Sequence, residues 1–212
     1  MFITFEGVEG SGKSLQILQA QAYLRQKGRE CLLTREPGGT DFGRKLRAVL
    51  LGTDGCRIEP WCELLLYLAD RYQHLKELIE PALRRGVVVL CDRYQDATRA
   101  YQGAARGISQ PEIERLRQLL GIIEPDRTVV LDLDPEIGLR RARTRNAADP
   151  AAAAEGRFEE ETVEFHRRVR RAYLDLAAQW PERMRVIPAS GTPEEVFSRI
   201  RPLLDTWMAE AE

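Results

Sequence analysis

The sequence predicts an α/β fold, in which a three-layer, doubly wound arrangement places helices on both faces of a five-stranded parallel sheet. Two observations support this fold class. Five short runs are apolar or β-branched, as buried strands are. Each run is followed by apolar residues at helical spacing, an alternation that is typical of parallel sheets. The expected strands are Phe2–Phe5, Cys31–Thr34, Val87–Cys91, Thr128–Leu133 and Arg185–Pro188.

Helical spacing of apolar residues places the helices between these strands. The first helix lies between Gly12 and Gly28 and ends in a basic turn followed by a glycine. Another helix is expected over the apolar face of residues 158–180, and the last helix of the chain should be kinked by Pro202. Residues 146–156 are small, polar and rich in alanine, and we expect them to form a mobile loop.

One expected helix, residues 59–83, is apolar on several faces and must be covered beyond the side that packs on the sheet. Two interpretations stay open. The extra apolar surface forms a dimer interface, or loops of the same chain cover it. The residues concerned stand near the start of the helix: Trp61, Leu64, Leu65, Leu66, Tyr67 and Leu68.

Length, composition and charge favour a single domain over residues 1–212. The chain is long enough to bury a full core, and 43% of its residues are hydrophobic. Its 32 lysines and arginines nearly balance its 33 aspartates and glutamates. This balance argues against a protein that coats nucleic acid or binds membranes through a polybasic surface. Because no apolar run approaches the length of a membrane span, we expect neither nucleic-acid nor membrane partners.

Cysteine usage and the start of the chain favour a reduced, cytoplasmic protein. The four cysteines form no CxxC pair and lack the spacing of metal ligands, and two of them lie inside expected strands, where a thiol is a small buried side chain. The first expected strand begins at the N-terminus, so we expect no signal peptide. A disulfide framework is not expected in such a chain. The cysteines are Cys31, Cys56, Cys62 and Cys91.

A phosphate-binding loop is the most informative local motif. Residues 7–14 satisfy the pattern G-x-x-x-x-G-K-[ST] between an expected strand and an expected helix, the context that this motif requires. Glycines let backbone N–H groups close around a phosphate at the positive end of the helix dipole. Lys13 then reaches the outer phosphates, and the hydroxyl of Ser14 is placed to ligate Mg²⁺. We expect a nucleoside triphosphate to be bound by Gly7, Val8, Glu9, Gly10, Ser11, Gly12, Lys13 and Ser14.

Three further clusters stand at or near the ends of expected strands, the edge at which ligands bind in open parallel sheets. Asp92 can hold a Mg²⁺-bound water, and Arg93 can hold a phosphoryl group in transit. Residues 34–40 (TREPGGT) predict a rigid turn whose charges face the same crevice. Residues 100–103 (AYQG) add a tyrosine that can stack on a ring and a glutamine that can bond the polar edge of a base.

Four motifs in this order and spacing resemble those of bacterial thymidylate kinases: FEGxEGxGKS, TREPGGT, DRYxDxxxAYQG and the Pro125-Asp126 pair before the fourth strand. The likeness runs over essentially the whole chain, and the second and third motifs are far more specific than the P-loop. The resemblance implies a P-loop NTPase fold and a homodimer. It also implies transfer of the γ-phosphoryl group of ATP to dTMP, with Mg²⁺ as cofactor.

The resemblance implies roles for individual residues. Glu9 matches the carboxylate that holds the sugar 3′-hydroxyl, and Tyr101 matches the ring that crowds the 2′ carbon. Arg93 matches the arginine between the donor and acceptor phosphates. Tyr67 stands where the family usually has a phenylalanine under the thymine ring. The remaining acceptor-site residues are Arg35, Glu36 and Pro37 of the rigid turn, Arg47 at the monophosphate, and Arg71, Thr98 and Gln102 at the base.

A lid at about residues 143–158 is expected to complete the site. Members of this family carry a catalytic arginine either in the P-loop or in the lid, and this P-loop has none. We expect Arg157 to neutralise the transferring phosphoryl group, with Arg143 and Arg145 as supporting phosphate ligands. A solvated arginine at a helix end is the competing interpretation for each. The expected catalytic set is Glu9, Lys13, Arg93 and Arg157.

Other functions are weighed against a dTMP kinase. A kinase for another nucleotide or for a nucleoside shares the P-loop, but TREPGGT and AYQG argue against it. A GTP-dependent switch would carry the guanine-reading motif Asn-Lys-x-Asp, which this sequence lacks. A scaffold with an inactive P-loop is disfavoured because Lys13, Ser14, Asp92 and Arg93 are all present.

Overall fold

The computed structural model describes residues 1–53 and 57–210. Five strands run parallel in the order β2-β3-β1-β4-β5, which confirms the doubly wound α/β sheet. The ends of each strand lie within two residues of those expected. The strands are β1 (Phe2–Gly7), β2 (Cys31–Arg35), β3 (Val88–Asp92), β4 (Arg127–Asp132) and β5 (Met184–Pro188).

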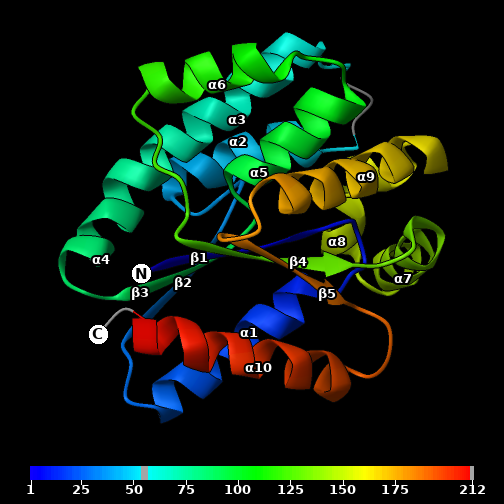
Figure 1. The fold of residues 1–212 in the computed structure, drawn as a ribbon. Coiled ribbons are helices and arrows are strands. Elements are labelled where there is room, and N and C mark those ends of the chain that lie inside the picture. The colour runs from blue at the N-terminus through cyan, green and yellow to red at the C-terminus, as the bar shows by residue number, and fades with distance from the viewer. Residues whose placement is uncertain (54–56, 211–212) are drawn as a thin grey trace.

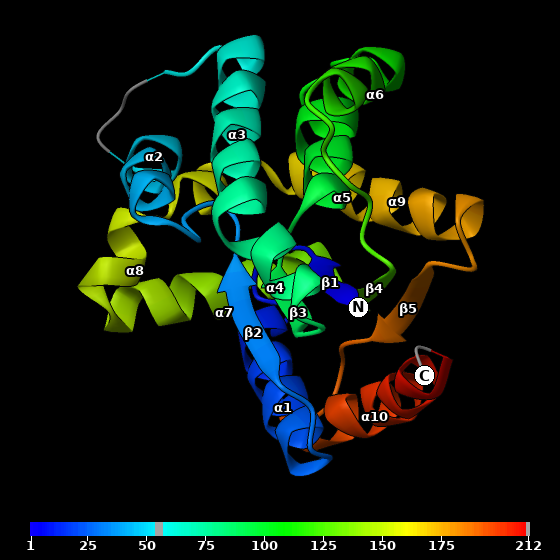
Figure 2. The same cartoon turned by 90° about the vertical axis from the view of Figure 1, so that its left-hand side faces the viewer.

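Helices cover both faces of the sheet and form the outer two of three layers (Figure 1). Below the sheet, α1 (Lys13–Gln26) and α10 (Pro193–Glu210) pack side by side. In the same view α7 (Pro135–Ala148) and α8 (Pro150–Ala154) stand beyond the carboxyl end of β4, and Figure 2 shows α8 beside α2. The upper side carries α2 (Asp41–Leu51), α3 (Pro60–His74), α4 (Glu80–Arg84), α5 (Gln95–Thr98), α6 (Gln110–Leu119) and α9 (Val163–Gln179).

One segment differs from the sequence-based expectation. Residues 146–156 are not a loop throughout, because α7 continues to Ala148 and α8 follows at once. The expected helix over residues 59–83 is helical from α3 to the end of α4, with a π-helical turn at Leu75–Ile79 between the two. The last helix, α10, runs through Pro202. Two further short segments are helical, a π-helical one at Arg99–Ala105 and a 3₁₀ turn at Arg157–Glu160.

Alternate residues of β3 serve the two faces of the sheet. Val88 and Leu90 belong to one buried cluster, which includes side chains of α1 and α10 below the sheet, whereas Val89 and Cys91 belong to another, which includes side chains of α3 and α6 above it. This period of two is the property of a strand that is covered on both sides. Burial on both faces explains why the central strands were readable as short apolar runs.

The strand register brings the expected site segments together. Asp92 at the end of β3 pairs with Arg35 of β2 on one side and with Phe5 of β1 on the other. The rigid turn after β2, the Asp92-Arg93 pair and the P-loop after β1 therefore meet at one edge of the sheet. This edge is the one at which parallel sheets bind ligands.

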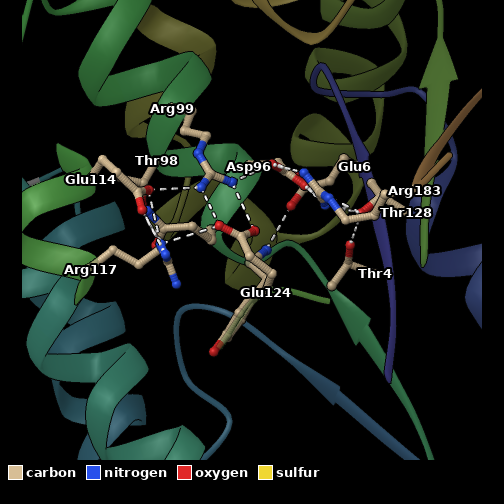
Figure 3. Close-up of polar contacts among 12 residues, drawn as sticks. Thr4, Glu6, Asp96, Thr98, Arg99, Glu114, Arg117, Glu124, Thr128 and Arg183 are labelled. Carbon is tan, nitrogen blue, oxygen red and sulfur yellow. Dashed lines mark hydrogen bonds and ion pairs between the residues drawn. The ribbon is translucent and has the colours of Figure 1, made fainter. Parts of the chain in front are cut away.

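A buried ion-pair network anchors α5 over the sheet (Figure 3). Asp96 is fully buried and accepts hydrogen bonds from Arg183 (2.7 and 2.9 Å) and from Arg99 (2.9 Å). Burial alone would raise the pKa of Asp96, but the two arginines lower it. Arg99 also pairs with Glu114 and Glu124. Because a buried charge is tolerated only when it is fully paired, this network fixes the backbone that leads into Thr98 and Gln102.

Three of the four cysteines lie in the described part of the chain. Cys31, Cys62 and Cys91 are free cysteines, and Cys56 lies outside the described residues. Within residues 1–53 and 57–210, every helix is too short or too polar to cross a membrane.

Candidate active site

The P-loop between β1 and α1 lines a cleft of about 550 Å³. Glycine is required at position 10, where φ is 67° and a Cβ would lie 2.0 Å from the carbonyl oxygen of Gly138. The buried ammonium of Lys13 donates to two carbonyl oxygens of the loop itself, at 2.9 and 3.1 Å. Burial, reinforced by the charge of Arg93, lowers the pKa of Lys13 to about 8. The loop thus holds a cation where phosphates would arrive.

Ser14 and Asp92 meet at the same part of the cleft. The hydroxyl of Ser14 donates to Asp92 Oδ2 at 2.8 Å. Hydroxyl and carboxylate oxygens suit Mg²⁺, which prefers oxygen ligands and usually takes most of its shell from phosphates and water. No group of three or more His, Cys, Asp or Glu side chains in the described part of the chain could hold a metal ion by itself. The pair fits a Mg²⁺ that arrives with a nucleotide.

Glu9 and Arg93 form an ion pair at the centre of the cleft. Arg93 Nη2 donates to Glu9 Oε1 at 2.9 Å, and the Tyr101 hydroxyl donates to the same oxygen at 2.7 Å. Burial alone would raise the pKa of Glu9, but Arg93 and His166 hold it well below its ordinary value. The backbone of Arg93 has a φ of 69°, a conformation that is rare outside glycine and concentrated at functional sites. Three expected catalytic residues, including Lys13, therefore line one cleft.

His166 connects this ion pair to the lid. Its Nδ1 lies 2.9 Å from Glu9 Oε2, outside hydrogen-bond geometry, and its Nε2 lies 2.9 Å from the carbonyl oxygen of Phe158. The ring is fully buried. The ring therefore contacts Glu9 on one side and bonds the carbonyl oxygen of Phe158 on the other, so that α9 links the P-loop to the 3₁₀ turn of the lid.

Arg71 is held on the base side of the cleft by a buried carboxylate. Its side chain is 1% exposed, and Nε donates to Glu36 Oε2 at 2.7 Å. Nη1 donates to Gln95 and to the hydroxyl of Thr98, at 2.9 and 2.8 Å. Nη2 donates to the carbonyl oxygen of Tyr94 at 3.0 Å. Burial alone would lower the pKa of Arg71, but Glu36 and Tyr94 raise it. Four of the five N–H groups of this guanidinium are therefore used within the protein.

Gln102 lines the cleft together with Arg71 and is bonded to a second buried carboxylate. Its Nε2 donates to Glu63 Oε1 at 2.8 Å, and both side chains are buried. Tyr67, one turn after Glu63 on α3, is half-buried and lines the cleft beside Arg71 and Gln102. Burial and the charge of Glu63 raise the pKa of Tyr67, which therefore stays neutral. The expected base-binding residues are thus gathered on one wall.

Arg47 and Arg35 mark the side of the cleft expected to bind the monophosphate. Arg47 donates to the carbonyl oxygen of Pro37 at 2.9 Å and to Glu155 Oε2 at 2.8 and 3.0 Å. Partial burial of its guanidinium, together with the charge of Arg47, lowers the pKa of Arg35. Glu155 follows α8 in the lid. A lid carboxylate therefore contacts the arginine that the sequence assigns to an acceptor phosphate.

The three lid arginines lie in different places. Arg145 lines the cleft and pairs with Glu159 at 3.0 Å. Arg143 donates to the carbonyl oxygen of Glu159 at 3.3 Å. Arg157, the expected catalytic arginine, donates to Glu63 Oε2 and to the carbonyl oxygen of Leu50, both at 2.6 Å. Arg143 and Arg157 are not among the residues that line the cleft. To reach a phosphate, Arg157 would have to leave a buried carboxylate.

The sequence interpretation missed several residues that hold the site together. Glu63 and His166 are fully buried polar side chains on helix faces that otherwise read as apolar. His74 bonds Glu36 Oε1 at 2.9 Å, opposite Arg71. A fully buried ionisable residue on an apolar helical face requires a partner, and this was the available signal. The identity of the partner was not readable, because Glu63 and Arg157 are 94 residues apart.

Comparison with known proteins agrees with this geometry. A family model described as "Thymidylate kinase" matches residues 5–200. The thymidylate kinase of Nitratidesulfovibrio vulgaris (strain DSM 19637 / Miyazaki F) is 53% identical over 204 residues, which cover 94% of each chain. That of Solidesulfovibrio magneticus is 52% identical and covers 94% of this chain and 96% of its own. The crystal structure of thymidylate kinase from Ehrlichia chaffeensis superposes with a TM-score of 0.77 at 32% identity, over 96% of this chain and 98% of that one.

Proposed function

The chain belongs to the thymidylate kinase family, and we propose how the residues of its cleft divide the work of that family's reaction. Its activity is the ATP-dependent phosphorylation of dTMP to dTDP, which makes it a nucleoside monophosphate kinase. The observation that carries the division of roles is the juxtaposition in one cleft of the P-loop, the Glu9–Arg93 pair and the buried readers Arg71 and Gln102.

The P-loop end of the cleft takes the phosphates of ATP. Backbone N–H groups of residues 7–14 and the ammonium of Lys13 supply the positive charge, and Lys13 exchanges its bonds to the loop carbonyl oxygens for the phosphates. Ser14 and Asp92 would hold Mg²⁺, which neutralises charge on the donor phosphates when bound. The negative charge of bound phosphates favours the protonated form of Lys13, against the burial that lowers its pKa.

Arg93 and Glu9 act where the two nucleotides meet. The guanidinium of Arg93 contacts both the donor and the acceptor phosphoryl groups and reduces their repulsion, as charge spreads over the transferring oxygens. Glu9 stays ionised because of Arg93, so its carboxylate accepts the sugar 3′-hydroxyl. Tyr101, bonded to Glu9, occupies the space that a ribose 2′-hydroxyl would need.

The base lies between Tyr67 and the two buried readers. Tyr67 offers a ring face for stacking, while Arg71 and Gln102 address the polar edge of thymine. Thr98 supports Arg71, to which its hydroxyl is bonded. Glu36 likewise acts through Arg71, and Pro37 acts through its carbonyl oxygen, which fixes Arg47. Arg47 and Arg35 bind the acceptor phosphate.

The lid closes the donor side. Arg145 is the lid arginine that lines the cleft, and we propose it as the first ligand of the transferring phosphoryl group, with Arg143 in support. A catalytic role for Arg157 remains a prediction, since it requires release from Glu63 and Leu50. Lid closure also excludes water, which would otherwise compete as the acceptor.

A coupled assay with ATP, Mg²⁺ and a panel of monophosphates tests this division. Wild type is expected to prefer dTMP in kcat/KM over dCMP, dGMP and the ribo counterpart of dTMP. Arg71→Ala and Gln102→Ala are expected to raise the KM for dTMP more than the KM for ATP. Equal losses for both substrates would contradict the assignment of these two residues to the base.

A homodimer is the proposed assembly, formed through α3. Three large side chains on one stripe of this helix remain exposed: Trp61 by 46%, Leu65 by 55% and Tyr72 by 42%. Loops of the same chain therefore do not cover the whole apolar surface, and a stripe of this kind suits a partner subunit. Leu65→Asp should convert a dimer to a monomer in light scattering, whereas Leu119→Asp, at a leucine that ends α6 and is 79% exposed, should not.

We propose that the protein is located in the cytoplasm. ATP and nucleoside monophosphates are intracellular metabolites, and a kinase that uses both must share their compartment. The free thiols of Cys31, Cys62 and Cys91 are compatible with reducing conditions. Fractionation of the source cells, with activity measured in each fraction, tests this location.

A further inference from the structure

Glu63 is a buried carboxylate without a direct contact to either proposed substrate. It lies in the first turn of α3, is fully buried, and contacts three donors from distant segments. Oε2 accepts from Arg157 at 2.6 Å, and Oε1 accepts from Gln102 at 2.8 Å. Arg106 adds two longer contacts of 3.4 Å, one to each oxygen. The charge is therefore compensated by arginines, while one oxygen is directed at an uncharged amide.

The contact with Glu63 determines which end of the Gln102 amide faces the cleft. A carboxylate can only accept hydrogen bonds, so the NH₂ end of the amide must point toward Glu63. The carbonyl end, Oε1, is then left for the cleft, which Gln102 lines. Gln102 therefore offers a ligand an acceptor and not a donor.

Arg71 supplies the complementary group. Glu36, Gln95, Thr98 and Tyr94 use four of its five N–H groups, which leaves one N–H on Nη2 for a ligand. A donor from Arg71 and an acceptor from Gln102 match the O4 and N3–H groups of thymine. Cytosine presents the reverse pattern at both positions, an amino donor and an unprotonated N3 acceptor.

We propose that Glu63 sets the base specificity of the acceptor site by locking the Gln102 amide with its carbonyl oxygen toward the cleft, so that thymine is accepted and cytosine is rejected. Glu63 is a positioning residue, because it acts through Gln102 and does not touch the base. This inference rests on the proposed role of Gln102 at the base. The competing interpretation is that Glu63 only balances the charges of Arg157 and Arg106.

The substitution Glu63→Gln distinguishes the two interpretations. The new amide is expected to turn its oxygen to Arg157, the nearest cation, and its NH₂ group to Gln102. Gln102 would then flip and present its own NH₂ group to the cleft, where it fits N3 of cytosine. The dTMP:dCMP ratio of kcat/KM should fall by about 10-fold or more, the scale on which a mismatched buried polar group is rejected. The KM for ATP should stay within about 2-fold, a change of less than ~0.5 kcal/mol.

Two controls make the outcome specific. Arg106→Gln removes a charge beside Glu63 but keeps the Glu63–Gln102 bond, so the dTMP:dCMP ratio should not change. In a Gln102→Met background, which has no amide to orient, Glu63→Gln should leave the ratio unchanged, because the two effects are coupled only through that amide. If Glu63→Gln folds poorly, Glu63→Asp retains the charge but withdraws it from Gln102, and should lower the ratio as well.

Different results overturn different claims. A ratio that is unchanged in folded Glu63→Gln and Glu63→Asp, or that falls equally in the Gln102→Met background, would overturn the orienting role. A wild-type enzyme that shows no preference for dTMP would instead overturn the proposed roles of the base readers. Calorimetric titration of each variant with dTMP and with dCMP gives the two Kd values, and their ratio tests the same preference from binding alone.

Discussion

The two walls of the cleft hold their arginines in different ways. On the base wall, Arg71 is 1% exposed and is fixed by four bonds, among them one to the buried Glu36. On the lid wall, the Arg145 side chain is 55% exposed and its carboxylate partner, Glu159, comes from the lid itself. Buried, fully bonded groups resist displacement, whereas exposed ion pairs contribute only about 0–1 kcal/mol.

The base wall of the cleft is therefore expected to be rigid, and the lid wall is expected to move. Selection of a base requires donors and acceptors that do not adapt to the wrong ligand, and the base wall has them preorganised. Phosphoryl transfer requires a lid that opens for products, and weak pairs allow it to move. Substitutions on the base wall should therefore change specificity, while those on the P-loop and lid should change turnover.

Lys13→Ala should cause the largest loss, at least ~10²-fold in kcat, because phosphoryl transfer depends on preorganised charge. The matched control is Lys27→Ala at the far end of α1, where the side chain is 57% exposed and lies 3.7 Å from Asp205. Steady-state kinetics with circular dichroism on both variants checks the prediction. Near-normal turnover in folded Lys13→Ala would remove this residue from the catalytic set.

Arg145 and Arg157 sharpen the comparison within the lid. Arg145→Ala is expected to lower single-turnover chemistry by up to ~10²-fold without loss of stability. Arg157→Ala should instead lower the thermal midpoint, because it removes a partner of the buried Glu63. Rapid-quench kinetics and thermal melts on both variants separate the two effects. Should Arg157→Ala abolish chemistry while Arg145→Ala does not, the expectation from sequence for Arg157 would replace the present assignment.

The sequence predicted the sheet and the P-loop because both depend on local patterns. Buried parallel strands read as short apolar runs, and strand ends in such a sheet share one edge. The segment around Pro150 shows a signal that was present but misread: alanine is the best helix former and proline is favoured at the first helical position, as α8 has them. The sequence could not predict that the Arg157 side chain points away from the cleft, because its partner, Glu63, stands in a distant helix.

Glu6 supports the base wall through Tyr94, whose carbonyl oxygen accepts from Arg71, and its effect can be tested through pH. It accepts from the backbone N–H of Tyr94 at 2.8 Å and from the hydroxyl of Tyr173 at 2.7 Å. Burial, together with the charge of Asp96, raises the pKa of Glu6 from 4.5 to about 7. Between these values the folded state keeps a proton that the unfolded state has lost, so the free energy of unfolding falls as pH rises. The free energy of unfolding falls by about 3 kcal/mol in total, and this fall is complete above pH 7.

Urea unfolding at pH 5 and pH 8 measures this slope. Glu6→Gln retains an oxygen that can accept from Tyr94 but cannot ionise, so its stability should fall less between the two pH values than that of wild type. All other titrating groups are shared by the two proteins and cancel in the comparison. If the free energy of unfolding of wild type and of Glu6→Gln fell in parallel with pH, the pKa of Glu6 would be the same in the folded and unfolded states. Burial of Glu6 would then have no pH-dependent effect on stability.

The smallest effect is expected where the lid contacts the acceptor-phosphate side of the cleft, at the pair of Arg47 and Glu155. Glu155 is 39% exposed at its side chain and contacts the guanidinium of Arg47 at 2.8 Å. The acceptor phosphate and this carboxylate are both anions that would use the same donors, so they compete. A pair of this exposure contributes about 0.2–1 kcal/mol, which corresponds to a change in affinity of between ~1.4-fold and ~5-fold.

Glu155→Gln should therefore lower the KM for dTMP by about 1.4- to 5-fold with kcat nearly unchanged. The matched control is Glu160→Gln, which removes the same charge from an exposed lid position. Because a general change in lid charge would act alike in both variants, only direct competition at Arg47 predicts a difference between them. The difference should shrink as salt is raised, since screening weakens exposed pairs. Equal KM values for the two variants would mean that Glu155 leaves Arg47 whenever substrate binds, at no measurable cost.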